Sequence, residues 1–127
     1  MQYAASAYAR VAQATQSPRE LEANVLLKAA SRLQAIGDDW AGRRAELDDA
    51  LTYNRKLWTI LVTSVTDAES ALPQPIKNNI ANLGLFVFHR TMDIVTAPAP
   101  EKLGVLVNIN RELAAGLRAQ QRPADAA

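Results

Sequence analysis

Apolar side chains recur along most of this chain at the spacing of one helix face. The first complete pattern starts at Ser17 and Pro18, since a serine can cap a helix and a proline fits its first turn. The apolar positions that follow lie four, four, four and three residues apart: Leu21, Val25, Ala29, Leu33 and Ile36. This spacing predicts an amphipathic helix, and Gly37 is expected to end it as a left-handed cap.

Two later segments carry heptad-like stripes, and each stripe includes one asparagine. Asp38 or Asp39 can cap the first of these helices, whose stripe is Leu47, Leu51, Asn54, Trp58, Leu61 and Val65. The second helix follows a break at Ala97–Pro100, and its stripe is Leu103, Leu106, Asn110, Leu113 and Leu117. The two amides could bond to each other across a bundle and fix the register of its helices.

Between these stripes lies the most apolar segment of the chain, residues 76–96. Pro75 fits the first turn of a helix there, and only Lys77, Arg90 and Asp93 are formally charged. One apolar stripe consists of Ile76, Ile80, Leu83, Val87 and Ile94. Further apolar side chains lie on other sides of the same helix: Leu85, Phe86 and Phe88. A helix that is apolar nearly all round is either central in a core or covered by a partner.

Together these patterns predict an all-α protein. We expect an antiparallel helical bundle of four longer helices, with a short N-terminal helix over Tyr3–Gln13. The length of 127 residues fits a single domain. We place this domain at residues 1–120 and a disordered C-terminal tail at residues 121–127.

The composition argues against several kinds of site. With 14 basic and 13 acidic residues, the chain lacks the basic excess typical of nucleic-acid binders. Cysteine is absent and there is one histidine, so no thiol nucleophile or multi-histidine metal site is expected, and no cofactor. The longest apolar run, residues 83–88, is far shorter than the roughly 20 residues of a membrane span. Residues 1–6 do not resemble a signal peptide, so we expect a cytoplasmic protein.

No constellation of residues points to an enzyme. His89 lies on the most apolar helix, where a structural histidine held by its neighbours is the simpler interpretation. Glycine-rich phosphate and dinucleotide motifs are absent from the sequence. The adjacent aspartates at 38–39 and 48–49 point about 100° apart on a helix, so neither pair can converge on one substrate.

Residues 53–58 favour a role in binding another protein. They place the amide of Asn54 on the stripe, two cations beside it and an indole one turn later, and Trp and Arg are the side chains most enriched in binding hot spots. Core packing of Trp58 is an equally good explanation. The candidate partner-binding residues are Arg55, Lys56, Trp58, Ile60, Leu85, Phe86 and Phe88. The candidate structural polar residues are Asn54, Asn110 and His89.

Four pieces of the sequence resemble the FlaF family, the flagellar biosynthesis regulators of alphaproteobacteria. They are residues 8–13 with Ser17–Glu20, residues 51–61, Leu72–Pro73 with Ile76 and residues 83–87, and residues 106–113. The resemblance implies a small cytoplasmic helical protein that binds flagellin as an export chaperone. It also implies a positive role in flagellin synthesis, opposite the regulator FlbT, which is a further candidate partner. It assigns no role to any single residue.

The physical form of this function would be an apolar groove that holds an amphipathic flagellin helix. Two alternatives remain open. The excess apolar surface could instead join copies of the chain in a homodimer or larger homo-oligomer. An RNA-binding regulator of the flagellin messenger would need a basic face, and the best cluster is interleaved with five acids between residues 38 and 49. That cluster consists of Arg43, Arg44, Arg55 and Lys56.

Overall fold

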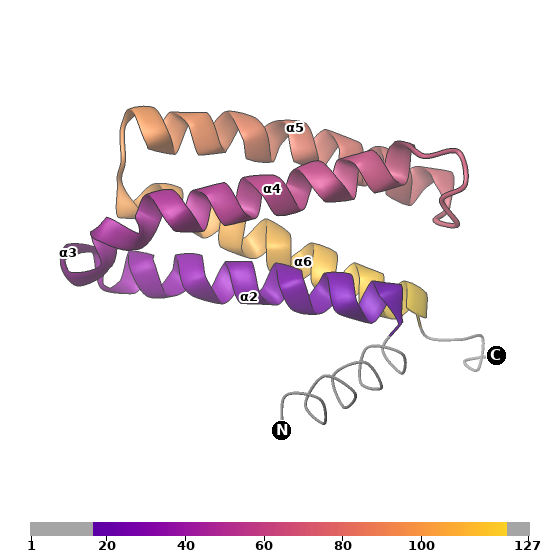
Figure 1. Cartoon of the computed structure of the whole chain (residues 1–127), viewed down its shortest axis with the longest axis horizontal. Coiled ribbons are helices and arrows are strands. Elements are labelled where there is room, and N and C mark those ends of the chain that lie inside the picture. The colour runs from indigo at the N-terminus through magenta and orange to yellow at the C-terminus, as the bar shows by residue number, and fades with distance from the viewer. Residues whose placement is uncertain (1–16, 122–127) are drawn as a thin grey trace, which may run out of the picture.

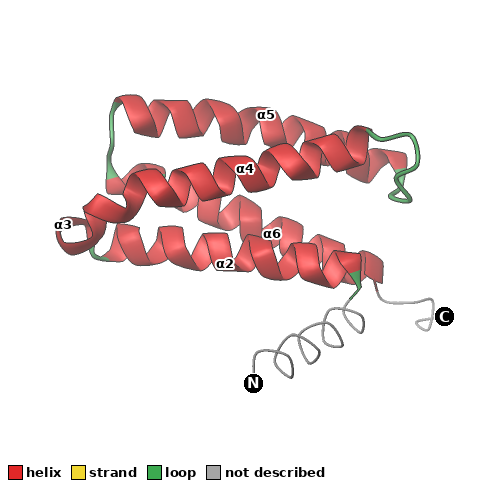
Figure 2. Ribbon diagram, in the orientation of Figure 1, coloured by secondary structure: helices red, strands yellow, loops and turns green. Residues whose placement is uncertain are grey.

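The computed structural model describes residues 17–121, and every regular element within that range is a helix (Figures 1 and 2). Four long helices run alternately up and down the molecule: α2 (Pro18–Asp38), α4 (Leu47–Thr66), α5 (Gln74–Thr96) and α6 (Gly104–Gln121). The predicted all-α bundle is therefore confirmed. The short helix expected over Tyr3–Gln13 lies outside the described residues. So does the expected tail from residue 122 onward, whereas Gln121 still belongs to α6.

The start of α2 follows its sequence signal, but its end does not. The Ser17 side chain accepts a hydrogen bond from the backbone N–H of Glu20 at 3.1 Å, and Pro18 occupies the first turn. The prediction of a left-handed cap at Gly37 is wrong, because no described residue has a positive φ. The helix continues through Gly37 to Asp38, and the chain turns at Asp39 instead.

The connection from α2 to α4 is broken into short pieces where one continuous helix start was expected. A single turn of helix, α3 (Trp40–Arg43), is followed by a 3-10 turn, η1 (Arg44–Glu46). Asp39 caps α3 by accepting from the N–H of Gly42 at 3.3 Å, as one of the two predicted caps. Residues 41–46 are all exposed, so no buried side chain holds this charged stretch in a longer helix.

The four long helices surround one core but do not contact one another to the same extent. The α2 helix lies along α6 and also packs on α4, whereas α5 packs chiefly on α4 and meets α6 only over a short stretch. Figure 1 shows α4 between α5 and α2 in this view. Near the start of α2, the Arg118 guanidinium of α6 donates to Oδ1 of Asn24 at 2.5 Å and lies 3.4 Å from the Glu20 carboxylate.

The predicted stripes form most of the core. All members of the α4 and α6 stripes are buried, including both asparagines. In α5, Ile80, Val87 and Ile94 are fully buried. The α2 stripe is displaced, because its first member Leu21 is 45% exposed while Leu26 is fully buried. The apolar spacing therefore located the buried faces of three helices well and that of α2 less well.

A glycine sets the close approach of α5 to α4. A Cβ atom added to Gly84 would lie 2.5 Å from Cγ2 of Val62 and 3.7 Å from the Trp58 ring. Only a residue without a side chain fits this crossing. The contact draws α5 onto α4, whereas α5 meets α6 only over a short stretch.

Candidate partner-binding surfaces

A buried polar centre joins three of the four long helices. The indole N–H of Trp58 donates to Oδ1 of Asn110 at 2.9 Å, and Nδ2 of Asn110 donates to Oδ1 of Asn54 at 2.7 Å. The same Nδ2 lies 3.4 Å from the backbone carbonyl of Leu26 in α2. All three side chains are completely buried. The predicted bond between the two amides is confirmed, and Trp58 is a core residue.

This centre also carries a cost. Nδ2 of Asn54 is buried and has no acceptor among the described residues. A buried donor without a partner opposes folding by about 1–3 kcal/mol. The centre compensates by fixing the register of the bundle, because its remaining hydrogen bonds form only when α2, α4 and α6 are correctly aligned along their axes.

The apolar residues outside the core of α5 fall on two sides of that helix. Phe86 and Phe88 are two residues apart and so point about 200° from each other. Phe88 belongs to a row that we call the outer stripe, spaced three, four and three residues apart: Leu85, Phe88, Met92 and Val95. Leu85, Met92 and Val95 are 61%, 60% and 52% exposed, and Phe88 is half-buried. The outer stripe lies beside α4, where Met92 and Val95 border Thr52 and Arg55.

On its other side, α5 faces α6 across a groove of about 340 Å³. We call this the α5–α6 groove. Its apolar residues are Ile76, Leu83, Ile109, Leu113 and Leu117. Ile76, Leu83 and Ile109 are half-buried, so apolar surface is open to the groove, and Asn79, Glu112 and Gln120 supply polar groups. The site combines open apolar surface between two helices with a polar rim, which is the chemistry of a groove that receives the apolar face of a helix.

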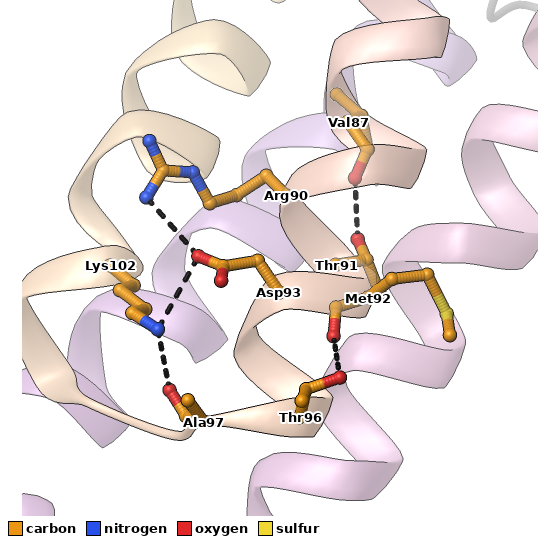
Figure 3. Close-up of polar contacts among 8 residues, drawn as sticks. All are labelled: Val87, Arg90, Thr91, Met92, Asp93, Thr96, Ala97 and Lys102. Carbon is orange, nitrogen blue, oxygen red and sulfur yellow. Dashed lines mark hydrogen bonds and ion pairs between the residues drawn. The ribbon is translucent and has the colours of Figure 1, made fainter.

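Charged residues mark the α6 side of α5 near its end. Figure 3 shows the Asp93 carboxylate between Arg90 and Lys102, at 3.9 Å and 3.4 Å, with Met92 on the opposite side of the helix. Lys102 lies in η2 (Pro100–Lys102), and its ammonium also donates to the carbonyl oxygen of Ala97 at 2.7 Å. These contacts hold the end of α5 to the segment that leads into α6.

A second hollow of similar size is a poorer match to an apolar ligand. It measures about 370 Å³ and lies where the end of α2 meets η2. Its apolar side chains Leu33, Leu103 and Val107 are at most 2% exposed, so they offer a ligand almost no surface. Asp38 and Glu101 add two carboxylates. The α5–α6 groove is the better candidate.

The structure does not bring the predicted partner-binding residues together. Trp58 is completely buried, so its assignment to a binding surface is wrong. Ile60 is 67% exposed but lies about 200° around α4 from Val62, the residue that faces α5. Phe86 is 41% exposed and carries the Arg90 guanidinium 5.6 Å above its ring.

The remaining predicted residues divide in the same way. Arg55 and Lys56 are exposed on the outer face of α4, and Leu85 and Phe88 belong to the outer stripe. His89 is exposed on α5, so its expected role as a structural histidine is wrong. The apolar run around it misled the interpretation, because neighbouring residues in a helix point in different directions.

The amino-acid sequence matches one protein family over nearly all of its length. The sequence model of that family, described as flagellar protein FlaF, matches residues 4–117. The chain belongs to the FlaF family. No curated protein matches it, and no solved structure does. The resemblance inferred from the sequence is therefore confirmed.

Membership of the FlaF family makes this a flagellar protein. The matched range includes the whole polar centre and the five apolar residues of the α5–α6 groove. None of the helices described in residues 17–121 is long and apolar enough to cross a membrane. The same residues contain no group of three or more His, Asp or Glu side chains placed to hold a metal ion.

Sequence reasoning missed both the groove and half of the outer stripe. Met92 and Val95 repeat at heptad spacing after Leu85 and Phe88, and this spacing was a usable signal. The groove residues gave none, because Ile76 and Leu83 belong to the same apolar stripe as the fully buried Ile80, Val87 and Ile94. Their partial exposure depends on how far α6 lies from α5, which no local pattern encodes.

Proposed function

We propose that this FlaF-family protein is a flagellin-binding protein without catalytic activity. It would act in the cytoplasm as an export chaperone for flagellin and as a positive regulator of flagellin synthesis. The α5–α6 groove would receive the apolar face of an amphipathic helix from one end of flagellin. The observation that carries the proposal is this open apolar groove in a member of a flagellar family.

The groove suits a reversible ligand helix on physical grounds. An amphipathic helix presents apolar side chains at i, i+3, i+4 and i+7, and a groove between two helices can hold such a row. Ile76 and Leu83 lie two turns apart along α5, as Ile109 and Gly116 do along α6. Gly116 has no atom within 4 Å of an added Cβ, so the groove is open at that point.

The proposed regulation of flagellin synthesis depends on whether flagellin occupies the groove. A protein that holds unpolymerised flagellin is free only when flagellin is scarce, so its free fraction can report demand for new flagellin. FlbT, the opposing regulator that the family resemblance suggests, is a candidate to bind the flagellin-free protein. Competition between flagellin and FlbT for this protein is the simplest linkage.

The experiment is co-purification with flagellin and with flagellin truncated at either end. We expect the full chain to bind, one truncation to abolish binding, and Ile109→Glu to weaken binding at least tenfold, because a carboxylate would be buried against the ligand. Ile60→Glu is the matched control, since Ile60 is 67% exposed on another helix. Equal binding by both variants would show that the groove is not the flagellin site.

A further inference from the structure

The outer face of α4 carries an ordered set of charges. Asp48 and Asp49 lie near its start, and Arg55 and Lys56 follow seven residues after each acid, two helical turns or about 10 Å further along. All four side chains are exposed, and Thr52 lies between the two pairs. Among the described residues none of the four takes part in an ion pair within 4.0 Å.

Apolar surface lies directly beside these charges. A hollow of about 260 Å³ between α4 and α5 is bordered by Thr52 and Arg55 on one helix and by Met92 and Val95 on the other. The hydroxyl of Thr59 on the exposed side of α4 donates to the backbone carbonyl of Arg55 at 2.9 Å. On α5 the Thr96 hydroxyl donates likewise to the carbonyl of Met92 at 2.8 Å (Figure 3). Such threonines offer a partner their methyl groups rather than a free hydroxyl.

The order of the charges restricts the kind of partner that fits this surface. An acid pair and a base pair placed symmetrically about Thr52 form a strip that is complementary to itself after a two-fold rotation. A partner of a single charge sign would be attracted by one half of the strip and repelled by the other. The exposed side chains of Met92 and Val95 would lie near the same axis and would meet their own copies.

We propose that this surface binds a second copy of the chain in an antiparallel dimer whose two-fold axis passes close to Thr52 and Met92. Asp48 and Asp49 of each copy face Arg55 and Lys56 of the other, so the same set of acid–base pairs forms on both sides of the two-fold axis. Met92 and Val95 of the two copies form the apolar centre. The dimer uses the α4 side of α5, whereas the α5–α6 groove lies on its other side, so the proposal does not rest on flagellin binding.

The first test is the molar mass of the purified chain, measured by light scattering over a range of concentrations. We expect the mass to rise from one chain toward two as the concentration is raised, because association of two copies depends on their concentration by mass action. Met92→Glu should hold the mass at that of one chain. Leu21→Glu, which adds the same charge at a 45% exposed apolar residue of α2, should dimerise as the natural chain does.

The second test uses charge exchange to check that these charges pair across the interface. Asp48→Arg with Asp49→Arg, and separately Arg55→Asp with Lys56→Asp, should each give a monomer where the natural chain dimerises, since like charges then meet. Mixing the two variants in equal amounts should restore the dimer, because every pairing between them is again of opposite sign. A natural chain that stays monomeric at hundreds of micromolar, or a mixture that does not associate, would overturn the proposal.

Discussion

At the scale of single residues, the polar centre shows what the buried asparagines contribute to the packing of the helices. Asn110 accepts from Trp58, donates to Asn54 and reaches the carbonyl of Leu26, so one amide links α6 to two other helices. A leucine in its place would fill the same space but could not distinguish one register from another. The asparagine therefore contributes specificity of packing more than net stability.

Removing this amide should destabilise the fold strongly. Asn110→Ala would leave the Trp58 N–H and the Asn54 side chain without their partners and would open a small cavity. We expect a loss of about 2–4 kcal/mol in the free energy of unfolding, measured by chemical denaturation. Asn108→Ala on the exposed side of the same helix should change it by less than about 0.5 kcal/mol. Equal effects from both variants would contradict a structural role for the centre.

At the scale of helices, the placement of α5 depends on its crossing with α4. Gly84 permits the close approach, and Val62 fills the space that a side chain would need. Valine has little freedom to move away, because its χ1 angle is restricted in a helix. The position of the groove on the other side of α5 is thus tied to a single missing Cβ atom.

Substitution at this crossing should separate steric strain from helix propensity. Gly84→Ala should destabilise by about 1–3 kcal/mol, despite the better helix propensity of alanine, because its Cβ would overlap Val62. Gly116→Ala should stabilise by up to about 1 kcal/mol, since nothing lies near its added Cβ. Thermal unfolding would measure both. Partial recovery of Gly84→Ala by Val62→Ala would assign the loss to this contact.

The helices also show what the sequence could predict. The stripes of α4 and α6 were predictable with their asparagines, because a seven-residue repeat marks one face whatever covers it. Helix geometry also indicates the burial of Trp58, which lies on the α4 stripe, and the exposure of His89, which points about 200° from the stripe residue Val87. The division of Phe86 from Phe88 was available from helix geometry alone, but which of them lies beside α4 was not.

At the scale of the whole molecule, α5 separates two proposed surfaces. The outer stripe and the charged face of α4 would join two copies, and the α5–α6 groove lies on the other side of α5. Neither surface needs residues of the other. A dimer could therefore hold one flagellin helix on each copy.

This arrangement predicts the composition of the complex. At concentrations where the chain dimerises, light scattering of the complex should give the mass of two chains and two flagellins. Met92→Glu should give one chain and one flagellin with unchanged affinity for flagellin in a titration. A complex of two chains with a single flagellin would instead show that ligand and dimer share a surface.

The polar centre has one more consequence, which concerns the helix that it omits. It ties α2, α4 and α6 by hydrogen bonds, whereas among the described residues no hydrogen bond or ion pair joins α5 to any of these three helices. Apolar burial holds α5 in place, and that attraction has no preferred direction. The chain thus combines a three-helix frame joined by directional hydrogen bonds with a fourth helix that the close fit at Gly84 and apolar burial hold against it, and that helix forms one wall of the groove.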